Sequence, residues 1–190
     1  MGNTRSLVNR ILAGNTRAFQ AVVETHQRLV SHIVFRMISN DTDREDMCQD
    51  VFLKVYQNLA DFNFESKLST WIAKIAYNTC INFLERKKTV LVDDFSSEGD
   101  SFDIFSSNDT LPDESAEKND LSVRLHGEIE RMPVHFRAIL TLYHLDEMSY
   151  SEISEVMELP EGTVKSHLFR ARKLLRERLL SKYQKEELWR

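Results

Sequence analysis

Apolar residues recur every three to four positions over most of the first ninety residues, which predicts amphipathic helices. The stripe in residues 16–40 consists of Phe19, Val22, Val23, Leu29, Val30, Ile33, Val34 and Met37. In residues 41–62 a possible capping box of Thr42 and Glu45 precedes a stripe of Met47, Val51, Phe52, Val55, Tyr56 and Leu59. A third helix, from residue 66 or 69 to Lys88, would bury Leu68, Trp71, Ile72, Ile75, Ala76 and Thr79.

The last seventy residues carry a second set of helical signals. One helix is expected from Leu121 to about Met132, and Pro133 should open another that reaches Leu145. Ser149 with Glu152 forms a second capping box, which predicts a short helix to about Met157. A tight Glu-Leu-Pro turn then leads into a basic helix, so the order is that of a helix-turn-helix unit.

The basic helix, residues 159–179, has two faces when its residues are placed at about 100° intervals. A narrow apolar stripe contains Val164, Leu168, Ala171 and Leu175. The outward face contains Lys165, Ser166, Phe169, Arg170, Arg172, Lys173 and Arg176. A solvated basic face and a membrane-surface or partner-binding helix are alternatives. The outward Phe169, the single acid Glu177 within 165–178 and the capped helix upstream favour a DNA recognition helix.

Composition narrows the class of protein. Only 5 of 190 residues are Gly and 3 are Pro, which favours helices over strands. The absence of an 18-residue apolar run and of a signal sequence predicts a cytoplasmic protein without membrane insertion. Cys48 and Cys80 stand apart from ligand-spaced partners, so we expect buried thiols and no metal or cofactor. The sequence contains neither a phosphate-binding loop nor a catalytic triad pattern. Nothing in it therefore predicts an enzyme or a small-molecule substrate.

Charge divides the chain into three parts. The net charge is +3 over residues 1–92, -9 over 93–120 and +1 over 121–190, which together give the -5 of the whole chain. The acidic part is rich in Ser, Asp and Glu and has no helical periodicity, so it predicts a flexible linker. The expected fold is therefore all-α, with two small helical domains, 1–92 and 121–190, joined by this linker.

These motifs together resemble those of a known family. The C-terminal part, with Met132-Pro133, Glu152-Ile153, Gly162-Thr163-Val164-Lys165-Ser166 and Arg170-Ala171-Arg172, resembles the σ4 domain of bacterial sigma factors of the sigma-70 family. The runs DREDMCQDVFLKVYQNLADF and FNFESKLSTWIAKIAYNTCINFLERKK resemble the two halves of the σ2 domain. With no further domain between them, the order is similar to the extracytoplasmic function (ECF) group. The alternative is a stand-alone helix-turn-helix regulator, but such a protein would have no role for the σ2-like segments.

The resemblance implies a non-enzymatic initiation subunit of RNA polymerase that reads promoter DNA. Lys165, Ser166, Phe169 and Arg170 would contact the −35 element, with Arg172, Lys173 and Arg176 mainly electrostatic. The −10 region would be melted and read by Phe62, Ser66, Lys67, Trp71, Lys74 and Asn78, with Arg86, Lys87 and Lys88 on phosphates. The spacing of Trp71 also fits a core position, and the basic cluster could equally complement the end of its helix. Gly162 is expected in the turn before the reading helix, where it would let a phosphate approach.

The resemblance also implies protein partners. Asp46, Gln49 and Asp50 would dock on the clamp helices of the polymerase β′ subunit, although their spacing alone also fits a solvated face. The σ4-like domain would meet the β flap, and members of the family are commonly held inactive by an anti-sigma factor. The acidic linker would thread the polymerase cleft, or serve as a soluble tether. Asn63-Phe64-Glu65, Leu68, Lys165 and His167 depart from common family residues, which bears on promoter preference.

Overall fold

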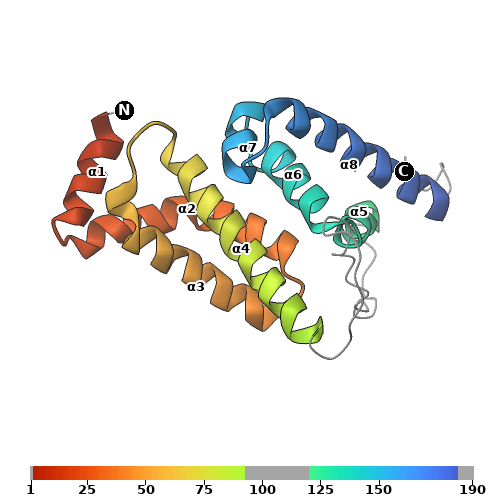
Figure 1. Ribbon diagram of the computed structural model, residues 1–190, viewed down its shortest axis with the longest axis horizontal. Helices are drawn as coiled ribbons and strands as arrows, with labels where there is room; N and C mark the ends of the chain where they lie inside the picture. Colours follow the sequence, from red (N-terminus) through yellow and green to blue (C-terminus); the bar gives the residue numbers. More distant parts are fainter. Residues whose placement is uncertain (1, 93–119, 184–190) are drawn as a thin grey trace.

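Every regular element in the described part of the chain is helical. The structure is a computed structural model that describes residues 2–92 and 120–183. The first group of elements is α1 (Gly2–Leu12), α2 (Thr16–Met37), α3 (Asp41–Gln57), the 3-10 turn η1 (Leu59–Asp61) and α4 (Leu68–Val92). The second group is α5 (Asp120–Glu130), α6 (Val134–His144), α7 (Tyr150–Met157) and α8 (Glu161–Lys182) (Figure 1). The all-α prediction is confirmed, whereas the predicted linker lies outside the described residues except for Asp120.

The first group packs α2 against α3 and α4, as its apolar stripes predict. The core of this group includes Val30, Ile33 and Val34 of α2, Val51 and Val55 of α3, and Ile72 and Ala76 of α4, all at most 1% exposed. The prediction for Tyr56 is wrong, because its side chain is 44% exposed and lies edge-on against Phe19 at the rim. Helix α1, which the sequence reading missed, buries Val8 and Ile11.

Two helix boundaries in this group differ from expectation. Helix α3 is capped by Asn40, whose side chain accepts a hydrogen bond from the backbone of Asp43 at 3.0 Å. The proposed Thr42–Glu45 capping box is therefore wrong, since Thr42 already lies inside the helix. Helix α4 continues to Val92, because no Gly or Pro stands between Lys88 and Val92 to stop it. Arg86, Lys87 and Lys88 thus lie before the last turn, which removes helix-end complementation as their explanation.

The second group contains the predicted helix-turn-helix unit, α7 and α8. Ser149 and Glu152 form the expected capping box at the start of α7. The chain then turns at Glu158, which has the left-handed backbone angle φ 54°. Helix α8 begins at Glu161, so Gly162 lies in its first turn and not in the preceding turn as expected. A side chain at Gly162 would meet no atom within 4 Å, which leaves this helix end open to an approaching group.

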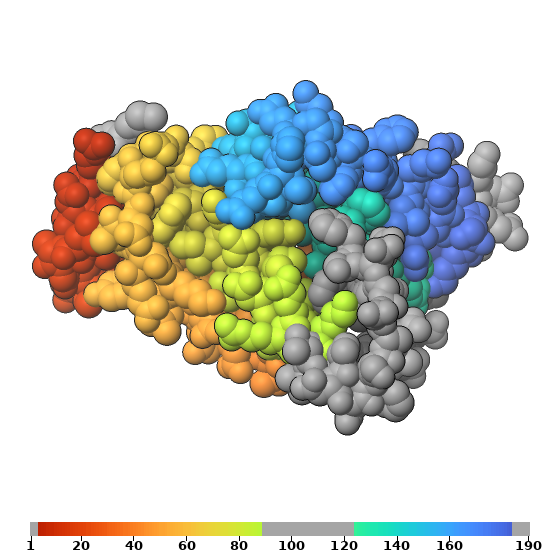
Figure 2. All heavy atoms as spheres, viewed as in Figure 1, coloured from red at the N-terminus to blue at the C-terminus, as the bar shows by residue number. Residues whose placement is uncertain are grey.

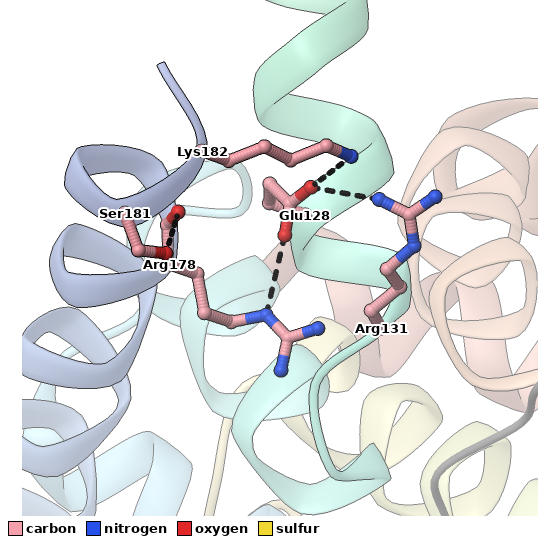
Figure 3. Close-up of polar contacts among 5 residues, drawn as sticks. All are labelled: Glu128, Arg131, Arg178, Ser181 and Lys182. Atoms are coloured by element: carbon pink, nitrogen blue, oxygen red, sulfur yellow. Dashed lines mark hydrogen bonds and ion pairs between the residues drawn. The ribbon is translucent and has the colours of Figure 1, made fainter. Parts of the chain in front are cut away.

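A charged cluster fixes the far end of α8 against α5. Glu128 of α5, with only 4% of its side chain exposed, accepts contacts from Arg131 at 2.7 Å, Lys182 at 2.9 Å and Arg178 at 3.3 Å (Figure 3). Burial raises the pKa of Glu128, but the hydrogen bonds from Lys182 and Arg178 outweigh this effect and the net shift is downward. The cluster therefore holds the long helix α8 at a defined angle to the rest of its group.

The two groups pack directly against each other through α2 with α6 and α4 with α7. In Figure 2 the spheres of α7 and the start of α8 rest against those of the segment around α4. Imidazole Nδ1 of His32 lies 2.9 Å from Asp146, which follows α6. Arg137 of α6 reaches the main-chain oxygen of Met37 at the end of α2, at 3.4 Å. Periodicity predicts each group but carries no signal for this contact between them.

Candidate nucleic-acid and polymerase interfaces

The outward face of α8 is exposed, as the helix rotation predicts. Val164, Leu168 and Ala171 are at most 1% exposed against α6 and α7, whereas Phe169 is 69% exposed. The cations of the outward face, Lys165, Arg170, Arg172, Lys173 and Arg176, are all exposed. Ser166 is half-buried, and its hydroxyl donates to the main-chain oxygen of Thr163 at 2.9 Å. A cationic surface with one projecting aromatic ring is therefore available on this helix.

Two tyrosines that the sequence reading missed flank this cationic face. The rings of Tyr143 and Tyr150 stack at 5.4 Å with an interplanar angle of 15°. Lys165 lies 5.5 Å from the Tyr150 ring centre and Arg172 lies 4.9 Å from that of Tyr143. Arg172 also donates to Nε2 of His144 at 3.2 Å. These contacts hold two of the cations near the junction of α6, α7 and α8.

The loop before α4 gathers aromatic rings. Phe62 is 4% exposed and packs under Phe64 and Trp71, with ring centres 4.7 Å and 5.4 Å away. Phe64 is half-buried, has φ 64°, and carries the guanidinium of Arg5 at 4.7 Å from its ring centre. Phe62 therefore supports the more accessible Phe64 and Trp71 rings. Arg5 and Phe64 were missed as site residues because α1 itself was missed and Phe64 was read only as a departure from the family pattern.

A cleft of about 1590 Å³ opens beside this loop. Its walls come from α1, the loop with Ser66 and Lys67, and residues Ser151, Glu152 and Glu155 of α7. Lys67 lies 2.9 Å from Glu152, and two turns further along α4 Lys74 lies 2.8 Å from Glu158. Burial raises the pKa of Glu152, but hydrogen bonds from Lys67 and Ser149 outweigh it and lower the pKa to about 2.

The remaining predicted −10 residues lie further along α4. Asn78 is half-buried one turn after Lys74. Arg86 and Lys87 are exposed and Lys88 is half-buried, roughly 20 Å from Lys74 at 1.5 Å per residue. Lys87 pairs with Asp43 of α3 at 3.4 Å. The structure therefore brings together Phe62, Ser66, Lys67 and Trp71, whereas the basic cluster is a separate patch on the same helix.

A polar strip lies on α3, away from the core. Asp46, Gln49 and Asp50 are all exposed, and Asp46 lies one helical turn before the other two. Leu53, which continues the strip by another turn, is 53% exposed. It was missed because an apolar residue was expected to face the core. Lys54, the residue after Leu53, is half-buried, and its ammonium donates to the hydroxyl of Thr79 at 3.2 Å.

An apolar groove of about 870 Å³ lies between α5, α6 and α8. Its lining includes Leu125, Ile129, Leu140, Leu175 and Leu179, together with Arg36 of α2. Sequence periodicity assigned only Leu175 of these residues to a helix face, and it could not show that three helices leave space between them.

Other sites receive little support in the described residues. Within 2–92 and 120–183, no three His, Cys, Asp or Glu side chains are grouped as metal ligands would be. Over the same ranges no helix has the length and apolar content needed to span a bilayer. Cys80 is buried and Cys48 is half-buried, and burial raises the pKa of both thiols, that of Cys80 to about 12.

Comparison with known proteins gives the family. The pattern of Sigma-70 region 2 matches residues 22–90, and that of Sigma-70, region 4 matches residues 122–175. The ECF RNA polymerase sigma-E factor of Escherichia coli (strain K12) is 34% identical over 178 residues, which span 89% of this chain and 90% of that protein. The RNA polymerase sigma-H factor of Pseudomonas aeruginosa is 32% identical over 177 residues, spanning 90% and 91% of the two chains.

The chain belongs to the ECF group of the sigma-70 family. It is an RNA polymerase sigma factor that directs transcription initiation, and it is not an enzyme. This sigma factor also resembles solved structures in fold. CnrH in complex with the cytosolic domain of CnrY superposes with a TM-score of 0.68 at 20% identity, over 94% of this chain and 98% of that chain. RpoE of Bartonella quintana, in complex with the anti-sigma factor NepR, gives 0.64 at 20% identity, over 87% and 98%.

Proposed function

We propose that this sigma factor recognises a −35 element as duplex DNA with α8 and a melted −10 strand with the loop before α4 and α4 itself. The observation that carries the proposal is the exposed face of α8, on which cations surround a 69% exposed Phe169. Such a ring among cations offers an apolar contact beside groups that bind phosphate. A helix fits the major groove of B-DNA, where bases present acceptor edges and thymine methyl groups.

The outward side chains of α8 would divide −35 recognition between base edges and phosphates. Lys165 and Arg170, near the start of the helix, would reach guanine edges or adjacent phosphates, and Phe169 would contact a thymine methyl. Arg172, held by Tyr143 and His144, would act on phosphates from a fixed position, together with Lys173 and Arg176. The open N-terminus of α8 at Gly162 would accept a phosphate from backbone N–H groups.

The −10 strand would lie along the cleft beside α4. Phe64 and Trp71, backed by Phe62, offer ring faces on which unstacked bases can pack. Lys67 and Lys74 would hold the strand phosphates, and Asn78 would hydrogen-bond an extruded base. Arg86, Lys87 and Lys88 would extend the phosphate track beyond the base-reading region.

Core polymerase would bind two surfaces of this sigma factor. The strip of Asp46, Gln49, Asp50 and Leu53 on α3 would dock on the clamp helices of β′. The apolar groove between α5, α6 and α8 would receive the β flap, since its leucines need an apolar partner. An anti-sigma factor is a further expected partner, because the similar RpoE structure is a complex with the anti-sigma factor NepR. We expect this sigma factor to act in the bacterial cytoplasm, with the polymerase.

Footprinting of the holoenzyme on a promoter selected from a random library tests the proposal. Lys165→Ala and Arg170→Ala should each weaken protection of the −35 element, and the slope of log affinity against log salt should fall by about 0.9 per lost phosphate contact. Arg17→Ala, which removes an exposed cation at the start of α2, is the matched control. Wild-type protection in both α8 variants would contradict the assignment of this face.

A further inference from the structure

Phe64, in the loop before α4, adopts a backbone conformation that few side chains tolerate. Its φ of 64° lies in the left-handed region, which favours glycine and in which a bulky residue costs free energy. The side chain of Asn63 accepts a hydrogen bond from the backbone N–H of Glu65 at 3.2 Å, which closes the turn around Phe64. A residue in such a conformation persists only where its surroundings fix it. The contacts of the Phe64 ring therefore decide the shape of the loop.

The Phe64 ring contacts Arg5 of α1 and Phe62. The guanidinium of Arg5 lies over the ring, 4.7 Å from its centre, and the ring centre of Phe62 is also 4.7 Å away. Phe62 is 4% exposed and continues the series to Trp71 of α4, with ring centres 5.4 Å apart. The four side chains thus form a continuous series of contacts from an exposed arginine to the start of α4.

Helix α1 carries Arg5 to this ring. Val8 and Ile11, which are 1% and 3% exposed, anchor α1 in the core. The helix packs against η1, beside the loop that leads to α4 (Figure 1). Arg5 precedes Val8 by about one helical turn. Because α1 contains no Asp or Glu, the contact of Arg5 with Phe64 is not a by-product of an ion pair along its own helix.

The same loop forms part of the surface that the proposed function assigns to the −10 strand. Arg5 and Phe64 line the cleft of about 1590 Å³ together with Ser66 and Lys67. Ser66 and Lys67 follow Phe64 by two and three residues, so the backbone conformation at Phe64 sets where they lie. If Phe64 left the left-handed region, the chain would change direction there and the ring would lose its support on Phe62.

We propose that Arg5 is a positioning residue for −10 recognition, which acts through Phe64 and not by contact with DNA. By lying over the ring, Arg5 holds Phe64 on Phe62 in its left-handed conformation. The loop then keeps the shape that receives an unstacked base and the neighbouring phosphates. A guanidinium suits this task, because it is planar and more weakly hydrated than an ammonium. The inference rests on the proposed assignment of this loop to the −10 strand.

The experiment measures the affinity of the holoenzyme for a labelled single strand that carries the selected −10 element, by anisotropy across salt concentrations. Arg5→Gln should weaken binding roughly 2- to 5-fold, the range for an exposed cation–π contact. The slope of log affinity against log salt should not change, whereas loss of a direct phosphate contact would lower it by about 0.7. Arg10→Gln removes the other arginine of α1, which also lines the cleft, and should keep the wild-type affinity and slope.

A double-mutant cycle with Phe64→Gly tests whether Arg5 acts through this ring. Glycine keeps access to the positive φ but removes the ring, so this substitution should weaken −10 binding by itself. In the Phe64→Gly background, Arg5→Gln should cause no further loss, because its partner is absent. Binding of the holoenzyme to a −35 duplex should stay at the wild-type level in every variant, which shows that each one folds and assembles.

Four results would overturn positioning by Arg5. They are a lower salt slope in Arg5→Gln, no loss of affinity, an equal loss in Arg10→Gln, or a loss in the Phe64→Gly background as large as in the wild type. Failure of the proposed function has a different appearance, because Phe64→Gly and Lys67→Ala would then bind the −10 strand as the wild type does. That result would remove the site itself, and with it the inference.

Discussion

Arg137 in α6 donates hydrogen bonds to two main-chain oxygens in different helix groups, that of Glu130 at 2.8 Å and that of Met37 at 3.4 Å. Met37 is the last residue of α2, whose final carbonyls have no partner within the helix. Burial lowers the pKa of Arg137 to about 10, partly offset by the charge of Glu130. The guanidinium stays protonated at neutral pH and acts as a C-terminal cap supplied by the other group.

Substitution Arg137→Ala should destabilise the full-length protein by about 2–3 kcal/mol, because it leaves buried carbonyls unpaired and opens a cavity. Urea denaturation followed by circular dichroism measures the change. Arg17→Ala, an exposed arginine substitution, should stay within about 0.5 kcal/mol of wild type. A loss no larger than that of the control would mean that the interdomain cap contributes nothing to stability.

The Glu128 cluster makes a prediction about pH. The pKa of Glu128 is lowered in the folded protein, so its contribution to stability is fully present above the unfolded-state value of 4.5 and is lost as pH falls through the lower folded-state value. Glu128→Gln should cost about 2 kcal/mol at pH 7, since it leaves three neighbouring cations without their shared anion. Urea unfolding measures the difference in free energy of unfolding between variant and wild type. This difference should be smaller at pH 3 than at pH 7.

The control for this variant is Glu130→Gln, which removes an acid from the same helix outside the cluster of Figure 3. Its difference from wild type should change less between the two pH values. If the Glu128→Gln gap is the same at pH 3 as at pH 7, the carboxylate is not held in its charged form by Arg178 and Lys182.

Local features of this fold follow from the sequence, and long-range ones do not. The Ser149–Glu152 cap and the inward stripe of Val164, Leu168 and Ala171 depend on neighbours three or four residues apart, so spacing predicts them. The predicted Thr42–Glu45 capping box is not formed. Asn40, two residues earlier, also has a side-chain acceptor and occupies the N-cap position.

The candidate sites also contain features that one helix determines and contacts that join distant segments of the chain. Rotation on one helix predicts the exposure of Phe169 and of Asp46, Gln49 and Asp50. Arg5 stacks on Phe64, which lies far from it in the sequence, and periodicity cannot predict a contact between such distant residues. The pairing of Lys67 with Glu152 was hidden for the same reason, although both residues stood in recognised motifs.

Leu168 and Phe169 are neighbours in sequence with opposite surroundings, 1% and 69% exposed. Leu168→Ala should lower the free energy of unfolding by about 2–5 kcal/mol, because it leaves a cavity between α8 and the helices beneath it. Phe169→Ala should leave stability within about 0.5 kcal/mol of wild type and weaken −35 binding by the holoenzyme. Thermal denaturation and promoter anisotropy separate the two effects. Equal loss of stability in both variants would refute the assigned faces of α8.

Asn78 and Asn82 lie one turn apart on α4, half-buried and exposed respectively. Asn78→Ala should impair open-complex formation, because a base extruded from the duplex would lose a hydrogen-bond partner worth about 1–3 kcal/mol, or roughly 5- to 150-fold in the opening equilibrium. Permanganate reactivity of −10 thymines reports the melted strand, while protection of the −35 element should be unchanged. Asn82→Ala is the same substitution on the same helix, it also leaves the charge unchanged, and it should leave both signals at wild-type levels. Normal thymine reactivity in Asn78→Ala would exclude this side chain from the base pocket and shift that role to Phe64 and Arg5, whose substitution the same footprint can assess.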